Sequence, residues 1–213
     1  MDNNNSNSRQ DYSGLKLNKE NISKNPFYQF EIWLNEAFKS KIEDPNAMVL
    51  STVSDKGKPS SRVVLLKSFD SNGFVFYSNY RSRKANQLVK NSFASLVFFW
   101  IPYQRQIRIE GIVRKLEAKH SDSYFNSRPK ESKISAIVSP QSEVIPNRSW
   151  LENKWNKFKD VAHEKEIQRP EYWGGYLLTP DRIEFWQGRS KRLHDRLEFV
   201  KEGEDWKIQR LAP

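Results

Sequence analysis

Five short clusters of polar and charged residues could carry chemistry. The first places an arginine and a lysine at either end of four aliphatic residues, in the run Arg62-Val63-Val64-Leu65-Leu66-Lys67. In a regular strand Arg62 and Lys67 face opposite sides, because their spacing is odd. Either they bind two different ligands, or one of them is a solvated surface charge.

The second cluster runs from Tyr77-Ser78 to Arg83-Lys84. Ser82 has the residue type of a helix N-cap, which would place Arg83 and Lys84 in the first helical turn. Positive charge is unfavourable there unless an anion binds. Free backbone N–H groups beside two cations therefore predict a phosphate site, and a solvated helix surface is the alternative.

The third cluster contains Tyr124 and Arg128, which lie on one face if the segment is helical. Ser132 continues that face if Pro129 only kinks the helix. Two hydroxyls and a guanidinium suit a phosphate group, but an ordinary helix surface explains the spacing equally well.

The fourth cluster, Gln141-Ser142, is a polar loop that says little by itself. The fifth runs from Trp186 to Arg196. If this segment is extended, Arg192, His194 and Arg196 point to one side and repel one another. Such a row predicts an anionic or electron-rich ligand that the three residues share.

Several kinds of chemistry are excluded. The chain has no cysteine, so disulfides and thiolate sites are absent and a cytoplasmic location is expected. His120, His163 and His194 lack metal-ligand spacing, and no metal is expected. Glycine-rich nucleotide loops and a Gly-x-Ser-x-Gly elbow are also missing.

The net charge of +10 is unevenly distributed. Residues 62–133 hold 14 basic and 5 acidic side chains, whereas the remaining residues are nearly balanced. This local excess predicts an anionic partner, either nucleic acid or phosphorylated small molecules. A solubilising surface is the alternative.

The elements that position these clusters are mostly strands. Asn25-Pro26 predicts the start of a helix, residues 82–90 predict a second, and residues 120–166 are mainly helical, with a capping box at Ser149-Trp150-Leu151-Glu152. Expected strands are 47–53, 61–69, 74–78, 93–101, 105–116, 173–178, 182–187, 196–201 and 206–210.

The order of these elements predicts a mainly β (α+β) fold, an antiparallel sheet or barrel with peripheral helices. Residues 1–24 predict a flexible tail, and 25–213 a single domain. No apolar run has the length of a membrane helix, and the N-terminus does not resemble a signal peptide.

Taken in order, the clusters resemble the pyridoxine (pyridoxamine) 5′-phosphate oxidase family from about Asn25 to Pro213. The most specific matches are RVVLLK, FYSNYRSRKANQL, YFNSRP, YWGG, IEFWQGRSKRLHDR and the final WKIQRLAP. The resemblance implies a split β-barrel of the FMN-binding type. It also implies a homodimer with FMN bound where the subunits meet.

The resemblance carries over residue by residue. It implies FMN contacts from Arg62, Val63, Val64, Leu65, Leu66, Lys67, Tyr77, Ser78, Arg83, Lys84, Gln106, Gln141, Ser142, Trp186 and Arg196. The implied substrate-phosphate ligands are Lys67, Tyr124, Arg128 and Ser132. Arg192 and His194 would lie over the substrate ring as catalytic residues. Arg9 and Tyr12 match a segment that closes over the site, although Gln10 replaces a family arginine.

The implied reaction, a step in vitamin B6 metabolism, oxidises pyridoxine 5′-phosphate and pyridoxamine 5′-phosphate to pyridoxal 5′-phosphate. A hydride would pass from C4′ to flavin N5, and O2 would accept the electrons and leave as H2O2, with NH3 released from the amine. No nucleic-acid or membrane partner is expected. One alternative is a split-barrel protein that binds a flavin or phosphate ligand without oxidase activity. The other is a basic nucleic-acid-binding β domain.

Overall fold

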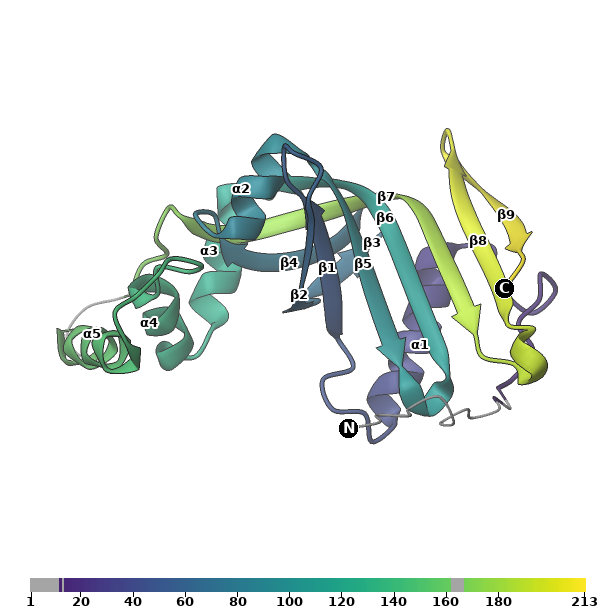
Figure 1. Ribbon diagram of the computed structural model, residues 1–213, viewed down its shortest axis with the longest axis horizontal. Coiled ribbons are helices and arrows are strands. Elements are labelled where there is room, and N and C mark those ends of the chain that lie inside the picture. Colours follow the sequence, from purple (N-terminus) through teal and green to yellow (C-terminus); the bar gives the residue numbers. More distant parts are fainter. Residues whose placement is uncertain (1–11, 13, 162–166) are drawn as a thin grey trace, which may run out of the picture. The chain divides into compact units, whose positions relative to one another are not determined.

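The computed structural model describes residues 12, 14–161 and 167–213 (Figure 1). In chain order the elements are α1 (Pro26–Lys39), β1 (Ala47–Val53), β2 (Pro59–Leu65), β3 (Ser68–Asp70), β4 (Gly73–Asn79), α2 (Arg83–Lys90), β5 (Phe93–Trp100), η2 (Ile101–Tyr103), β6 (Arg105–Lys115), α3 (Ala118–Ser127), α4 (Lys130–Val138), α5 (Arg148–Val161), β7 (Trp173–Gln187), η3 (Ser190–Arg192), β8 (Asp195–Glu202) and β9 (Asp205–Leu211). Helices interrupt the strands rather than alternate with them, as expected for the mainly β class.

The strands are hydrogen-bonded in the order β2-β1-β5-β6-β7-β4-β3, and β8 pairs with both β7 and β9. The pairs β3–β4, β4–β7, β7–β8 and β8–β9 are antiparallel. The expectation of two strands at 173–178 and 182–187 is wrong, because β7 is continuous. Its first half pairs with β4 and its second half with β8, so Pro180 falls between the two paired stretches.

The chain forms two compact units. Unit 1 comprises Met1–Val49, Ser95–Glu110 and Pro180–Pro213, and unit 2 comprises Leu50–Ala94 and Gly111–Thr179. The prediction of one domain after a tail stays a prediction. Within unit 1, Leu17 and Ile22 from the expected tail are buried, and the backbone N–H of Leu17 donates to Asp195.

The core of unit 1 forms where α1 contributes aromatic side chains to the sheet strands of that unit. Asn25 caps the helix by accepting from the backbone of Phe27, and Pro26 occupies the first turn, as the sequence predicts. Phe30 lies edge-on to Phe98, with ring centroids 5.1 Å apart. Burying large aromatic side chains at helical spacing makes this face of α1 the one that packs inward.

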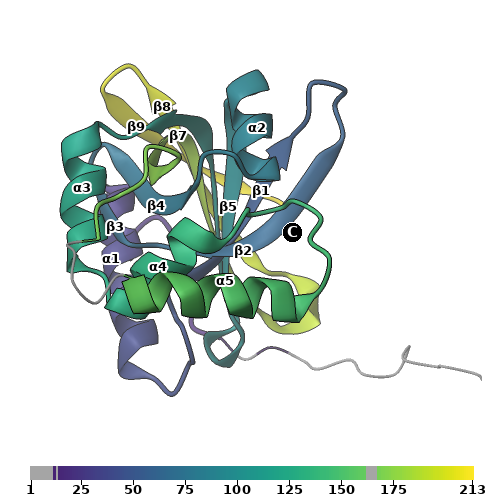
Figure 2. The ribbon, with the colours of Figure 1, turned by 90° about the vertical axis from the view of Figure 1, so that its left-hand side faces the viewer.

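The core of unit 2 is built on the β4–β7 pair, in which Phe74, Phe76 and Leu178 are fully buried. Tyr77 stands opposite Gly175 in this register. A side chain at Gly175 would come within 2.9 Å of the Tyr77 ring, so only glycine leaves room for that ring. The helices α4 and α5 of this unit lie side by side (Figures 1 and 2).

Two local expectations are wrong. The strand expected at 61–69 breaks at Leu66, because the chain leaves β1 as its partner and β3 pairs with β4 instead. The capping box at Ser149 is not formed, since Asn147 accepts from the backbone of Trp150 and α5 begins at Arg148. Glu152 pairs with Arg148, one helical turn earlier.

Among the described residues, no helix is long and apolar enough to cross a membrane.

Candidate functional site

Within the described chain, the guanidinium of Arg62, in β2 of unit 2, donates to neutral acceptors only. It donates to the backbone oxygen of Leu50 at 3.1 Å, to Thr52 Oγ1 at 2.6 Å and to Ser60 Oγ at 2.6 Å. Burial and, secondarily, the charge of Arg83 lower the pKa of Arg62. A cation held in this way keeps its full charge available to a ligand.

Lys84 lies close by, and its hydrogen-bond partners among the described residues are neutral as well. Its ammonium donates to Ser78 Oγ at 3.1 Å and to Gln141 Oε1 at 2.9 Å, and Ser82 Oγ lies 3.4 Å away. Burial, followed by the charge of Arg62, lowers the pKa of Lys84 to about 8. Within the described chain, no carboxylate pairs with either Arg62 or Lys84.

The start of α2 adds to this positive potential. Ser82 caps the helix by accepting from the backbone of Ala85, as the sequence predicts, and places Arg83 and Lys84 in the first turn. Arg83 is exposed and lines a cavity of about 680 Å³ together with Gln87 and Ser142. These cations, the helix N–H groups and an adjacent cavity form a site that fits a phosphate group.

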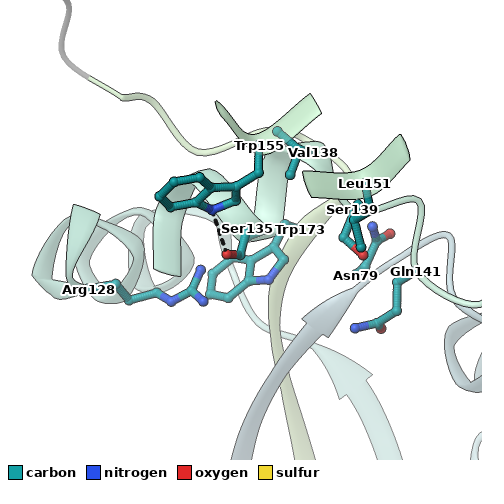
Figure 3. A pocket seen from close by; sticks show the side chains of 10 residues that line it. Asn79, Arg128, Ser135, Val138, Ser139, Gln141, Leu151, Trp155 and Trp173 are labelled. Carbon is teal, nitrogen blue, oxygen red and sulfur yellow. Dashed lines mark hydrogen bonds between the residues drawn. The ribbon is translucent and has the colours of Figure 1, made fainter. Parts of the chain in front are cut away.

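An aromatic stack lies in the same unit. Tyr77 stacks on Tyr124 with ring centroids 3.9 Å apart and on Trp173 at 5.5 Å. Arg128 sits over the Trp173 ring at 4.5 Å, and its buried Nη1 has no hydrogen-bond partner among the described residues. Arg128 lines a cavity of about 360 Å³ together with Ser135 and Trp173 (Figure 3).

The expectation that Tyr124 and Arg128 share one helical face is wrong. α3 ends at Ser127, and Arg128 is an extended cap residue with ψ 149°. The two side chains nevertheless meet around Trp173, because Tyr124 stacks against that ring and Arg128 covers it. Pro129 therefore separates two helices, and Ser132 belongs to α4.

The other residues expected in this part of the site are placed unevenly. Gln141 joins the Lys84 network directly, whereas Ser142, in the left-handed region at φ 74°, borders the larger cavity. Lys67, Val63 and Leu65 are exposed, and Val64 is half-buried. Leu66 is buried where the strand breaks, so a ligand contact from Leu66 would be made by its backbone.

In unit 1, Trp186 and His194 form a second cluster with Tyr12. The rings of Trp186 and His194 lie 4.7 Å apart, and Tyr12 approaches both edge-on at 5.9 and 5.6 Å. His194 Nδ1 accepts from the backbone N–H of Arg189 at 3.1 Å. In the neutral ring this leaves the proton on Nε2, which then acts as a donor.

The extended row expected at Arg192, His194 and Arg196 is wrong. A 3₁₀ turn covers Ser190–Arg192, and Arg192 adopts the left-handed region at φ 60°. Strand β8 begins only at Asp195, so the three side chains do not alternate along one strand. Arg192 is exposed, whereas His194 is half-buried.

Arg196 has a counter-charge. Its Nε and Nη2 donate to the two carboxylate oxygens of Glu184 at 2.6 and 3.0 Å, and its Nη1 donates to the Ala212 oxygen. Glu184 also pairs with Arg108 at 2.9 Å. These contacts raise the pKa of Arg196, with the hydrogen bond to Glu184 as the largest cause.

The remaining expected residues are Gln106 and those of the N-terminal segment. Gln106 is half-buried in β6. Arg9 and Gln10 lie outside the described residues. The expected lid over the site, Tyr12 included, stays a prediction. Among the described residues, no group of three or more His, Asp or Glu side chains is placed to hold a metal ion.

Reasoning from the sequence missed several residues that hold the site together. Thr52, Ser60 and Gln87 surround Arg62, and Glu184 neutralises Arg196. Only Ser60 had a local signal, since it shares the face of Arg62 two residues away in the same strand.

The fold and the site together define an antiparallel β protein that has a cationic pocket in one of its units. Residues 34–162 match the sequence profile of the family described as pyridoxamine 5′-phosphate oxidase. Residues 173–213 match the pyridoxine 5′-phosphate oxidase C-terminal dimerisation region. The chain belongs to the pyridoxamine 5′-phosphate oxidase family.

Curated relatives carry the same family name along nearly the whole chain. A pyridoxine/pyridoxamine 5′-phosphate oxidase of Legionella pneumophila (strain Paris) is 48% identical over 205 residues, which are 96% of this chain and 95% of the relative. The protein of that name from Gloeothece citriformis is 49% identical over 206 residues, which are 96% of each chain. These names place the chain among oxidoreductases.

A solved structure supports the fold. The crystal structure of PhzG from Burkholderia lata 383, in complex with tetrahydrophenazine-1-carboxylic acid, matches with a TM-score of 0.89 and 29% identity. The match covers 96% of this chain and 100% of PhzG. The expected split-barrel fold class is thereby confirmed.

Proposed function

We propose that this protein is an FMN-dependent oxidase that forms pyridoxal 5′-phosphate from pyridoxine 5′-phosphate and from pyridoxamine 5′-phosphate. The observation that carries the proposal is a pair of cations, half-buried Arg62 and buried Lys84, that no carboxylate of the described chain neutralises. Relatives of about 48% identity, which are named for this activity, support it.

In this proposal the FMN phosphate binds to Arg62, Arg83 and Lys84. Serine and glutamine side chains complete the pocket, since Ser78 and Gln141 already contact the ammonium of Lys84. FMN contacts from Trp186, Arg196 and Gln106, which all belong to unit 1, stay predictions of the family resemblance. The matched dimerisation region is consistent with a homodimer in which FMN lies between subunits.

The substrate phosphate is assigned to Arg128, with Tyr124, Ser132 and Lys67 as its further ligands. Arg128 is suited to this role because its buried Nη1 lacks a partner and burial lowers its pKa. An anion at Arg128 would restore the interactions that burial removes.

The reaction balances as pyridoxine 5′-phosphate plus O2 giving pyridoxal 5′-phosphate plus H2O2. For the amine, one water enters and NH3 leaves. Bound FMN supplies the two-electron redox chemistry that no side chain of this protein provides. The protein binds and orients the substrate, so that energy from the phosphate contacts positions the reacting carbon.

Two side chains of unit 1 are assigned to the reacting end of the substrate. His194 would present the Nε2 proton as a donor, since its Nδ1 is occupied by the Arg189 backbone. Arg192 would supply a positive charge from its exposed position in the 3₁₀ turn. Together they would orient C4′ and bind the oxygen or nitrogen that it carries.

A second candidate function comes from the structural likeness to PhzG, whose crystal structure contains a tetrahydrophenazine carboxylic acid. A carboxylate could also bind to Arg128. The lower identity to PhzG, 29% against 48% for the oxidase of L. pneumophila, favours the phosphorylated substrates.

The direct test is to purify the protein, reconstitute it with FMN and record the flavin spectrum. Pyridoxine 5′-phosphate and pyridoxamine 5′-phosphate are then added with oxygen, while pyridoxal 5′-phosphate and H2O2 are measured. We expect stoichiometric product and peroxide, with no turnover of unphosphorylated pyridoxine. A colourless protein that takes up no FMN, or a flavoprotein that releases no peroxide, would refute the proposal. Turnover of a tetrahydrophenazine carboxylate alone would establish the second candidate.

A further inference from the structure

Gln87 is a buried glutamine that the proposed site does not yet use. It lies on α2, in unit 2, with its side chain only 6% exposed. Its Oε1 accepts two hydrogen bonds, from Thr52 Oγ1 at 2.6 Å and from Ser60 Oγ at 2.8 Å. One amide oxygen thus joins the two neighbouring strands β1 and β2 at the position of Arg62.

The same two hydroxyl oxygens accept from Arg62. Thr52 Oγ1 lies 2.6 Å from Arg62 Nη1, and Ser60 Oγ lies 2.6 Å from Arg62 Nη2. A hydroxyl group has a single proton, and both hydroxyls donate theirs in the hydrogen bond to Gln87 Oε1. The lone pairs of both hydroxyls therefore face the guanidinium, and the position of Arg62 is fixed through Gln87.

The neutrality of the amide has a separate consequence. A carboxylate at position 87 could accept the same two hydrogen bonds, but it would put a negative charge directly behind the guanidinium. With glutamine there, Arg62 is oriented while its charge remains uncompensated, as the lowering of its pKa by burial and Arg83 also indicates. Gln87 also lines the cavity that Arg83 and Ser142 border, so this arrangement lies next to the space for a ligand.

We propose that Gln87 is a positioning residue that orients Arg62 toward a phosphate group without neutralising it, and that it thereby sets the preference for the phosphorylated flavin. The inference rests on the proposed function, because the phosphate in question is that of FMN. It assigns two separable effects to one side chain, the geometry of Arg62 and the charge that Arg62 presents.

Two variants separate these effects. Gln87→Met keeps a similar volume but removes the acceptor. The hydroxyls of Thr52 and Ser60 can then rotate, and Arg62 loses its fixed orientation. Gln87→Glu keeps the acceptor and adds a negative charge. A matched control is Gln29→Met, since Gln29 is 4% exposed and its Oε1 also accepts a hydrogen bond, from Ser23, but it lies on α1 in unit 1.

The measurement is the dissociation constant of each apo-protein for FMN and for riboflavin, which lacks the phosphate, by quenching of flavin fluorescence. We expect Gln87→Met to weaken FMN binding roughly tenfold and Gln87→Glu roughly 30-fold or more, while riboflavin binding changes less than about threefold. Gln29→Met should leave both constants unchanged. Thermal unfolding of each variant establishes that it is folded, and Gln87→Glu provides the result if Gln87→Met does not fold.

The possible results have distinct meanings. Equal weakening of FMN and riboflavin would show a merely structural role for Gln87 and overturn the inference. An unchanged preference for FMN in both variants would overturn it as well, while the proposed function stands. A wild-type protein that binds neither flavin would refute the proposed function, and the inference with it.

Discussion

Each of the two units contains an arginine that is among the expected ligand residues. The arginine of unit 1 has a counter-charge, whereas that of unit 2 has none among the described residues. In unit 1, Arg196 is paired with both carboxylate oxygens of Glu184, and its pKa is raised. In unit 2, Arg62 has neutral partners, and burial lowers its pKa. An uncompensated cation identifies an anion site, whereas a compensated one stabilises the protein itself.

This difference separates the roles of the two clusters. The cations of unit 2 can attract a phosphate, because no carboxylate of the described chain pairs with Arg62 or Lys84. Arg196 offers little net charge, and its donors are already directed to Glu184 and the Ala212 oxygen. A contact between Arg196 and a cofactor therefore stays a prediction. It would require Arg196 to share its donors between the cofactor and its present partners.

The largest effect should come from removing a counter-charge. Glu184 is 2% exposed and pairs with both Arg108 and Arg196, so Glu184→Ala should lower the free energy of unfolding by about 3–5 kcal/mol. In unit 2, Lys84→Met should leave the stability of the apo-protein unchanged or raised, because it removes a desolvated, unpaired charge. Urea unfolding measures the free energy of unfolding of both variants. Similar losses of stability in the two would contradict the proposed difference between the units.

The next effect is catalytic. Arg192→Ala should lower kcat/KM by at least about 100-fold, because the charge at the reacting end of the substrate is lost. FMN binding should remain within about threefold of wild type, since the cations of unit 2 are intact. Steady-state kinetics and a flavin titration measure both quantities. Near-normal turnover would remove Arg192 from the catalytic residues.

Arg128→Ala should act on binding instead. We expect KM for pyridoxine 5′-phosphate to rise roughly 30-fold with kcat within about threefold, as for a residue that contacts the distant phosphate. Leu193→Ala, a change at an exposed side chain of unit 1, serves as a comparison. A large fall in kcat at unchanged KM would contradict this assignment.

The smallest effect concerns pH. Because the pKa of Lys84 is about 8 in the apo-protein, the ammonium loses its proton as the pH rises above that value. The dissociation constant for FMN should then increase up to about tenfold between pH 8 and 9. Over the same range the Lys84 contribution to apo-protein stability should rise with pH, since the unfolded chain keeps its proton up to a higher pH. Lys84→Arg, which stays charged, should abolish the pH dependence, and a slope that persists in this variant would assign it to another group.

Local sequence signals predicted the elements well. Asn25-Pro26 and Ser82 each have the residue types that begin helices, and both caps form. The strand Ala47–Val53 also has its expected bounds. Such signals act within one turn or one strand, whereas distant pairing broke the strand expected at 61–69.

The rest of the site depends on contacts between distant segments. Gln87 meets Thr52 and Ser60 across 35 and 27 positions, and polar residues of these types carry no specific signal in a sequence. A glutamate such as Glu184 is expected at the surface. It is buried here because Arg108 and Arg196 on the neighbouring strands pair with it. The turn at Arg192 requires a left-handed backbone that its residue type does not favour. The cytoplasmic location and the individual ligand roles stay predictions.

The central claim is that the unpaired cations of unit 2 bind the phosphate of a flavin. The most direct measurement is a titration of the wild-type apo-protein with FMN and with riboflavin under the same conditions. The account predicts that FMN binds at least about 100-fold more tightly, because Arg62, Arg83 and Lys84 contact the phosphate that riboflavin lacks. Equal affinity for the two flavins would contradict it.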